Sequence, residues 1–112
     1  VFGTRILGVG IAYKPDVADD RESASIEVLR ELEKRGAEIA VLDPVVGNQR
    51  IESHGFTAVD SDSSLEEYSI AVLLTDHAVL DLESIAAQVG SVLDTRGAFR
   101  RAGIERDNVE AL

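Results

Sequence analysis

The stretch from residue 5 to residue 43 has the pattern of a strand, a long loop, a helix and a second strand. Residues 5–11 form a short apolar run, which predicts a strand buried on both faces. Apolar residues then recur at three- and four-residue spacing over 23–35, as in an amphipathic helix, and Gly36 follows as its cap. A second apolar run covers 39–42. Such a connection makes the two strands parallel and right-handed.

The rest of the chain continues the alternation of strands and helices. We expect a single domain over residues 1–112, of the α/β class, with a doubly wound, mostly parallel, Rossmann-like sheet of five to six strands and helices on both faces. The further predicted elements are a weak helix at 48–54, a strand at 57–59, a helical turn at 63–68 whose Ser63-Ser-Leu-Glu66 fits a capping box, a strand at 70–74, a helix at 82–89, a strand at 91–93, and a helical turn plus an edge strand within 99–112.

The charge balance narrows the possible partners. Eleven Lys and Arg against 21 Asp and Glu give a net charge of −10, which repels phosphate backbones and anionic lipid surfaces, so we predict no nucleic-acid and no membrane partner. With only two lysines, the acidic surface fits either adaptation to high salt or an ordinary acidic domain. The absence of cysteine excludes a thiol nucleophile, a disulfide and a cysteine zinc site within this chain.

The first residues carry neither an initiator Met nor a basic-then-apolar signal pattern. We therefore expect this sequence to be a piece of a longer protein.

Gly8 and Gly10 follow one another in a Gly-x-Gly pattern that resembles the start of a dinucleotide fingerprint. Two features disfavour an autonomous NAD site. Tyr13 stands where a small third residue is needed, and the helix begins only near residue 22, too late to receive a pyrophosphate. Close packing of a buried strand explains the two glycines more simply.

The loop over residues 13–23 is more informative, because it follows a central strand at the edge where parallel α/β sheets bind ligands. Lys14 and Arg21 lie on this loop, and Arg96 follows the strand at 91–93 and so belongs to the same edge. Cations gathered on an acidic protein predict a compact anionic ligand such as a phosphate or a diphosphate. Tyr13 adds an aromatic face that could stack on a base or a ribose.

Each of these residues also has a structural interpretation. Arg21 is surrounded by acidic residues and is better explained as a brace within the loop, whereas Lys14 and Arg96 favour ligand contact. Asp76 and His77 could be interpreted as a general base and its partner, but adjacent residues rarely face each other. We therefore expect His77 to be a cap or a surface residue. No set of residues combines a nucleophile, a base and an oxyanion donor, so we predict no catalytic residue and no metal site in this chain.

Four segments in order resemble the C-terminal, UDP-binding domain of the UDP-glucose/GDP-mannose dehydrogenase family. The longest is Ile-Leu-Gly-Val-Gly-Ile-Ala-Tyr-Lys-Pro-Asp-Val-Ala-Asp-Asp-Arg-Glu-Ser at 6–23. The others are Gly-Ala-Glu-Ile-Ala-Val-Leu-Asp-Pro at 36–44, Val-Leu-Leu-Thr-Asp-His at 72–77 and Val-Leu-Asp-Thr-Arg-Gly at 92–97. The resemblance covers nearly the whole chain. One departure is Ala24, where many members have proline.

The resemblance implies a function that composition could not show. Members of this family are cytoplasmic enzymes that oxidise the C6 alcohol of a nucleotide sugar to a carboxylate in two NAD-dependent steps, through a thiol-linked intermediate. NAD is bound by an N-terminal domain outside this chain, a central helical region forms a homodimer, and this domain holds the UDP-sugar. The Tyr-Lys-Pro-Asp form at 13–16 favours the branch acting on UDP-N-acetylglucosamine or UDP-N-acetylmannosamine, with UDP-glucose still open.

The resemblance also assigns roles to individual residues. Tyr13, Lys14 and Arg96 match positions that contact the bound nucleotide sugar. A second set matches the family's charged loop and is assigned to holding that loop in shape: Asp16, Asp20, Arg21, Glu22 and Ser23. The alternative is a free-standing regulatory or interaction domain without a ligand, in which the whole loop is structural.

Overall fold

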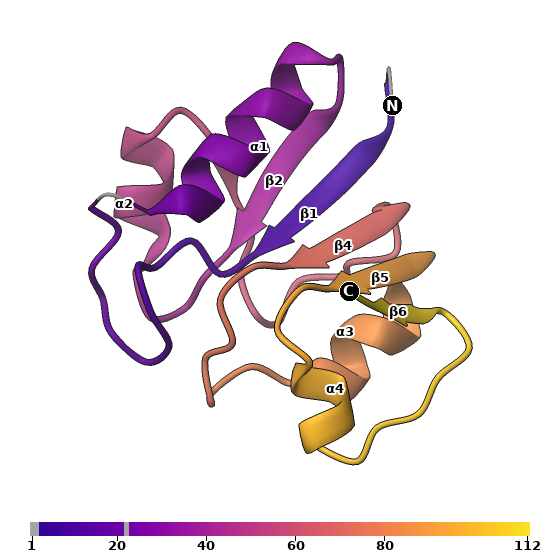
Figure 1. The fold of residues 1–112 in the computed structure, drawn as a ribbon. Helices are drawn as coiled ribbons and strands as arrows, with labels where there is room; N and C mark the ends of the chain where they lie inside the picture. The colour runs from indigo at the N-terminus through magenta and orange to yellow at the C-terminus, as the bar shows by residue number, and fades with distance from the viewer. Residues whose placement is uncertain (1–2, 22) are drawn as a thin grey trace.

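The computed structural model describes residues 3–21 and 23–112 and shows one six-stranded sheet in the order β3-β2-β1-β4-β5-β6. All five strand pairs are parallel, which confirms the predicted α/β fold class (Figure 1). The strands are β1 (Arg5–Val9), β2 (Glu38–Leu42), β3 (Thr57–Ala58), β4 (Ile70–Leu73), β5 (Ser91–Asp94) and β6 (Val109–Ala111).

Helices cover both faces of the sheet, as a doubly wound fold requires. They are α1 (Ala24–Lys34), α2 (Asn48–Ser53), α3 (Leu82–Gln88) and α4 (Ala98–Arg101). One core lies under α1 and α2 and includes Leu29 and Ile51, both fully buried. The other lies under α3 and α4 and includes Ala86 and Phe99. Figure 1 shows the two pairs of helices on opposite sides of the twisted sheet.

Gly8 allows α1 to pack directly onto the central strand β1. A Cβ at this position would stand 2.8 Å from the Leu29 side chain, closer than side-chain atoms pack. The packing explanation of this glycine therefore holds. A pair of layers brought together in this way fixes where the loop before α1 must run.

Most predicted elements are confirmed within one or two residues, and one is wrong. Residues 63–68 form turns and no helix. Leu65 and Tyr68 are both buried in the core under α3, and the Leu65 amide donates to Oε1 of Gln88 at 2.9 Å. These tertiary contacts hold the segment in an irregular path, in which the capping-box residues have no helix to cap.

The sheet face carrying α1 is only partly covered. Beyond α1, an open apolar groove of about 550 Å³ runs beside β4 and β5. Val28 and Leu32 of α1 form one wall, and Arg96 stands at the polar end. In the part of the chain that the structure describes, no helix has the length and apolar character needed to cross a bilayer.

Candidate functional site

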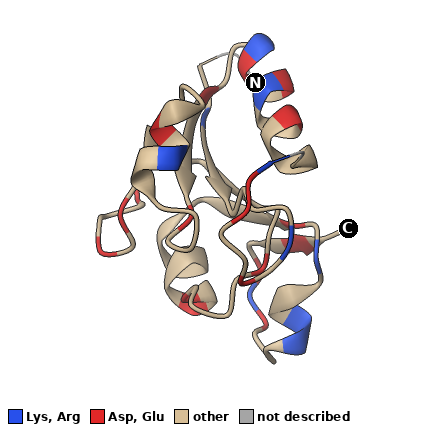
Figure 2. Cartoon of the chain, turned by 90° about the vertical axis from the view of Figure 1, so that its left-hand side faces the viewer, with Lys and Arg blue, Asp and Glu red and all other residues tan. Residues whose placement is uncertain are grey.

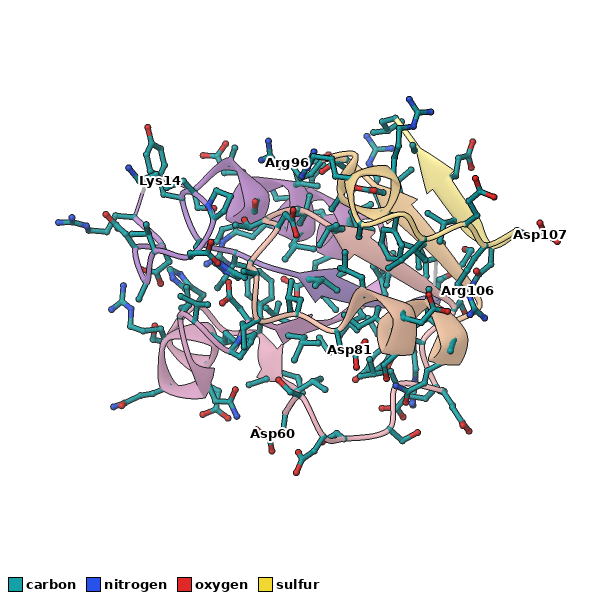
Figure 3. The ribbon with its side chains drawn as sticks, turned by 90° about the horizontal axis from the view of Figure 1, so that it is seen from below. Lys14, Asp60, Asp81, Arg96, Arg106 and Asp107 are labelled. Atoms are coloured by element: carbon teal, nitrogen blue, oxygen red, sulfur yellow. The ribbon has the colours of Figure 1, made fainter. Side chains whose placement is uncertain are left out.

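The predicted site residues lie on loops at the carboxyl end of the sheet. Lys14 follows β1 and Arg96 follows β5, and both side chains are exposed. Figure 3 shows them on two different loops, with Lys14 at the outer edge of the molecule. Tyr13, beside Lys14, is 61% exposed. Because the strands are parallel, these residues share one edge, but β4 lies between β1 and β5, which places the two strands about 10 Å apart.

Arg96 is held by its own strand end. Its Nε donates to the Leu74 carbonyl oxygen at 2.7 Å, and its amide donates to Oδ1 of Asp94 at 2.9 Å. The other oxygen of Asp94 accepts from the amide of Phe99, at the start of α4, at 3.0 Å. Asp94 is buried and accepts the backbone amides of Arg96 and Phe99. The sequence did not predict this role, because a polar residue after a strand has no distinctive local pattern. The hydrogen bonds of Arg96 orient its side chain up to Nε, and with it the two terminal guanidinium nitrogens.

The loop after β4 places Asp76 between these two cations in strand order, where its charge would oppose an anionic ligand. Arg101 of α4 offsets that charge, because its NH2 donates to Oδ2 of Asp76 at 2.9 Å. Arg101 also donates to the Arg96 carbonyl oxygen. Asp76 is therefore paired and does not stand as an isolated negative charge between Lys14 and Arg96 in strand order.

Asp20 ties the loop after β1 to α2. Its side chain is 4% exposed and receives NH2 of Arg50 at 2.9 Å, while Nε2 of His54 lies 2.6 Å from Oδ2. The hydrogen bonds from Arg50, and then His54, outweigh the effect of burial and lower the pKa of Asp20 from 3.8 to about 2. The Asp20 carboxylate is therefore charged at neutral pH, and its ion pair with Arg50 persists at that pH.

The other predicted brace residues differ in their surroundings. Arg21 pairs with Asp19 at 3.1 Å, and its side chain is 81% exposed. Hydrogen bonding to Arg21 lowers the pKa of Asp19. Ser23 is buried at the N-cap of α1, without a side-chain capping bond. Glu22 lies outside the described residues. The bracing roles remain predictions, which the contacts of Asp20 support more directly than those of Arg21.

His77 is buried, so the expectation of a cap or surface residue is wrong. Its Nε2 lies 3.0 Å from Oδ2 of Asp43, and both side chains are fully buried. Asp43 comes directly after β2, and Ile11, which follows β1, donates its amide to the same carboxylate oxygen at 2.7 Å. The sequence separates His77 from Asp43 by 34 residues, and only the order β2-β1-β4 brings them together.

The crevice between β1 and β4 is the topological switch point, where a dinucleotide would sit in a Rossmann fold. Here it is closed. A Cβ on Gly10 would stand 2.3 Å from the Thr75 carbonyl oxygen, and the Thr75 hydroxyl donates to the Ala12 carbonyl oxygen at 2.9 Å. Helix α1 begins only at Ala24, far from this crevice in sequence. The described residues therefore lack the short strand-to-helix turn that a dinucleotide fingerprint requires.

The side chains at this edge of the sheet can be compared with the groups that metals and anions require. The described residues contain no group of three or more His, Asp or Glu that could hold a metal ion. On the side that Figure 2 shows, basic segments are interspersed with acidic ones. Exposed cations on two oriented loops, next to an exposed tyrosine ring, can contact a compact anion that carries a flat ring.

Comparisons with known proteins identify the family of this chain. A sequence model described as the UDP-glucose/GDP-mannose dehydrogenase family, UDP binding domain, matches residues 7–101. A UDP-N-acetyl-D-mannosamine dehydrogenase of Yersinia pestis is 32% identical over 101 residues, covering 86% of this chain and 24% of that protein. A UDP-glucose 6-dehydrogenase of Haloferax volcanii is 27% identical over 113 residues, covering 96% of this chain and 26% of that protein.

A solved structure of a UDP-N-acetyl-mannosamine dehydrogenase from S. aureus shares the fold, with a TM-score of 0.68 and 22% identity over 99% of this chain and 26% of that one. The chain thus spans about a quarter of the length of the relatives it matches. The family match extends from β1 through α4 and includes both loops that carry the exposed cations. The chain therefore belongs to the UDP-glucose/GDP-mannose dehydrogenase family, of which it forms the UDP-binding domain.

Proposed function

We propose that this chain is the nucleotide-sugar-binding module of an NAD-dependent UDP-sugar 6-dehydrogenase, which oxidises the C6 alcohol of its substrate to a carboxylate. The observation that carries the proposal is the pair of exposed cations, Lys14 and Arg96, at the carboxyl edge of the sheet of a UDP-binding domain. In this assignment both cations contact the diphosphate, and the ring of Tyr13 lies against the nucleoside.

The geometry of the edge supports a ligand of this size. The ends of β1 and β5 are about 10 Å apart, and each is followed by a loop that carries one exposed cation. A diphosphate with an attached ring system is long enough to contact both loops. The pairing of Asp76 with Arg101 removes an opposing charge from the middle of the path.

The oxidation itself is assigned to parts of the full-length protein outside this chain. The chain has no cysteine, and its first strand is followed by a long loop instead of the short turn of a dinucleotide fingerprint. Relatives about four times as long as this chain leave room for an NAD-binding domain and a central dimerisation region. We propose that these domains of the same polypeptide cover the open groove beside Arg96, since it adjoins the nucleotide edge and is largely apolar.

Two relatives favour an N-acetylhexosamine as the sugar. One is the Yersinia pestis UDP-N-acetyl-D-mannosamine dehydrogenase. The other is an NDP-N-acetyl-D-galactosaminuronic acid dehydrogenase of Ralstonia solanacearum, 29% identical over 80% of this chain and 22% of that protein. The Haloferax volcanii relative acts on UDP-glucose by its name. UDP-N-acetylhexosamines are therefore the substrates we propose to test first.

Calorimetric titration with UDP, UDP-N-acetylglucosamine, GDP and NADH, at low and at high salt, tests the proposal. We expect saturable binding of the two uridine ligands only, with weak affinity, because an isolated half-site lacks the domain that closes over the ligand. NADH binding as strong as UDP binding would contradict the assignment. If none of the four ligands binds, either to this domain or to the full-length protein, the result would instead favour a free-standing regulatory or interaction domain.

A further inference from the structure

Both ring nitrogens of His77 are engaged inside the protein. Nε2 lies 3.0 Å from Oδ2 of Asp43, and Nδ1 lies 2.8 Å from the backbone nitrogen of Asp16. The side chains of His77 and Asp43 are fully buried. The imidazole thus links the end of β2 to the loop that carries Lys14.

The hydrogen-bond partners define the state of this ring. A backbone N–H can only donate, so Nδ1 of His77 must offer a lone pair to Asp16. The hydrogen of the neutral imidazole then sits on Nε2 and is donated to Asp43. The Asp43 carboxylate also accepts the amides of Ile11, Val45 and Val46 at 2.7–3.0 Å. A protonated ring would have no acceptor left for the amide of Asp16.

Asp43 is the charged group in contact with His77, and other charges lie nearby. The carboxylate of Asp16 faces the segment after β4, where its Oδ1 accepts the amide of Ala78 at 2.7 Å. Four further charged residues share a cavity of about 390 Å³ with His77: Asp76, Asp81, Glu83 and Arg101.

Asp16 has a backbone conformation that needs support. Its φ is 62°, in the left-handed region that non-glycine residues rarely adopt. Two hydrogen bonds hold it there, one from its amide to His77 and one to its side chain from Ala78. Lys14 is separated from this fixed point only by Pro15, whose ring restricts its own φ and the backbone of the residue before it. The direction in which Lys14 leaves the loop is therefore set by the contact at His77.

We propose that His77, as the neutral Nε2–H tautomer, is a positioning residue for Lys14. It holds Asp16 in its left-handed conformation and so fixes the loop that presents the Lys14 ammonium at the sheet edge. His77 itself touches no ligand in this scheme. The inference rests on the proposed function only in that the presented ammonium binds a nucleotide diphosphate.

The first test needs no ligand and measures the tautomer of the His77 ring and the exchange rate of the Asp16 amide. Nitrogen-15 NMR of the imidazole should show a protonated Nε2 and an unprotonated Nδ1 for His77 at neutral pH. The amide of Asp16 should exchange slowly, although its residue is exposed. The variant His54→Gln removes the only other histidine and assigns the signals. A protonated Nδ1, or a fast-exchanging Asp16 amide, would overturn the proposal whether or not the domain binds nucleotides.

The second test uses UDP-N-acetylglucosamine, because its diphosphate is esterified at both ends and does not titrate near neutral pH. His77→Phe removes both hydrogen bonds and should weaken binding about tenfold or more. His77→Asn places an amide oxygen near the position of Nδ1 and should restore most of the affinity and the slow exchange of Asp16.

A double-mutant cycle separates positioning from general damage. If His77 acts through Lys14, the loss caused by His77→Phe should largely disappear in a Lys14→Ala background. If the affinity losses of His77→Phe and Lys14→Ala simply add in the double variant, His77 does not act through Lys14. This outcome would refute positioning even if wild-type protein binds UDP-N-acetylglucosamine. If wild-type protein binds no uridine ligand, the proposed function fails, and the ring and amide measurements alone decide the role of His77. The same two measurements decide it if His77→Phe does not fold.

Discussion

A Cβ on Gly10 would lie 2.3 Å from the carbonyl oxygen of Thr75, and Gly10 has a φ of 84°. The chain leaving β1 therefore passes directly against the chain leaving β4, at the place where related folds open a crevice. The loops that carry Lys14 and Arg96 leave the same edge of the sheet, on either side of this contact.

The contact predicts a large cost for a methyl group at position 10. Gly10→Ala should lower the free energy of unfolding by about 3 kcal/mol or more, since it adds a backbone clash to an unfavourable φ. Gly55→Ala is the matched control, because Gly55 has a φ of 86° with no atom near its Cβ position, and it should cost only about 1–2 kcal/mol. Urea unfolding of the two variants measures the difference. Equal losses would show that the approach to Thr75 is looser than described.

Removal of either exposed cation should weaken nucleotide binding and leave the fold intact. Lys14→Ala and Arg96→Ala should each reduce UDP affinity by about 1.5–3 kcal/mol, the range for a charge-assisted contact. Lys34→Ala is the control, since Lys34 is exposed at the far end of α1. Calorimetry with UDP measures affinity and circular dichroism checks folding. Unchanged affinity in both site variants would rule out the assigned edge.

Asp20 should make stability depend on acidity in a defined direction. Its folded-state pKa of about 2 lies below its ordinary value of 3.8, so its contribution is complete above about pH 4 and is lost as the pH falls through about 2. That contribution is about 2 kcal/mol. Asp20→Asn should therefore be less stable than wild type at about pH 5, and the gap should shrink towards about pH 2.

Urea unfolding of wild type and Asp20→Asn across this range provides the measurement. The control variant Asp62→Asn changes an exposed turn residue. Its free energy of unfolding should differ from that of wild type by the same amount at about pH 5 and at about pH 2. A gap between wild type and Asp20→Asn that stays constant with pH would show that the carboxylate is not the group that matters.

The two arginines near the loop should differ in their effect on stability. Arg50 pairs with a carboxylate that is 4% exposed, whereas Arg21 pairs with Asp19, which is 34% exposed. Loss of Arg50 leaves a buried charge with His54 as its remaining partner, so Arg50→Ala should lower Tm by several degrees. Arg21→Ala should leave Tm nearly unchanged, because exposed ion pairs contribute little to stability. Thermal unfolding compares them, and the opposite order would make Arg21 the main brace of the loop.

The elements of the fold were predictable because the buried strands and α1 carry strong local patterns. Apolar runs mark β1, β2 and β4, and the spacing of Ile26 and Leu29 marks the buried face of α1. The helix expected at 63–68 was wrong because a capping box is a local signal. At Leu65, burial of the side chain and a hydrogen bond from the backbone amide to Oε1 of Gln88 decided the conformation instead.

The candidate site was predictable only in part. Strand ends locate Lys14 and Arg96, since a parallel sheet gathers them at one edge. Asp94 and Asp43 were harder, because a polar residue after a strand can face a ligand or turn inward to cap a neighbouring loop. Both are buried and accept backbone amides. The partnership of Asp43 with His77 depends on strand order, which local sequence does not encode.

The all-parallel sheet also has a consequence for how the chain reaches its native state. The central strand β1 pairs with β2 on one side and with β4 on the other, and Ile6 aligns with Ile70. No pair of neighbouring strands can form as a hairpin, so each pairing closes a long segment of chain first. We expect refolding slower than that of a helical domain of equal length. Until β4 docks, β1 keeps an open apolar edge, and refolding yield should fall as protein concentration rises.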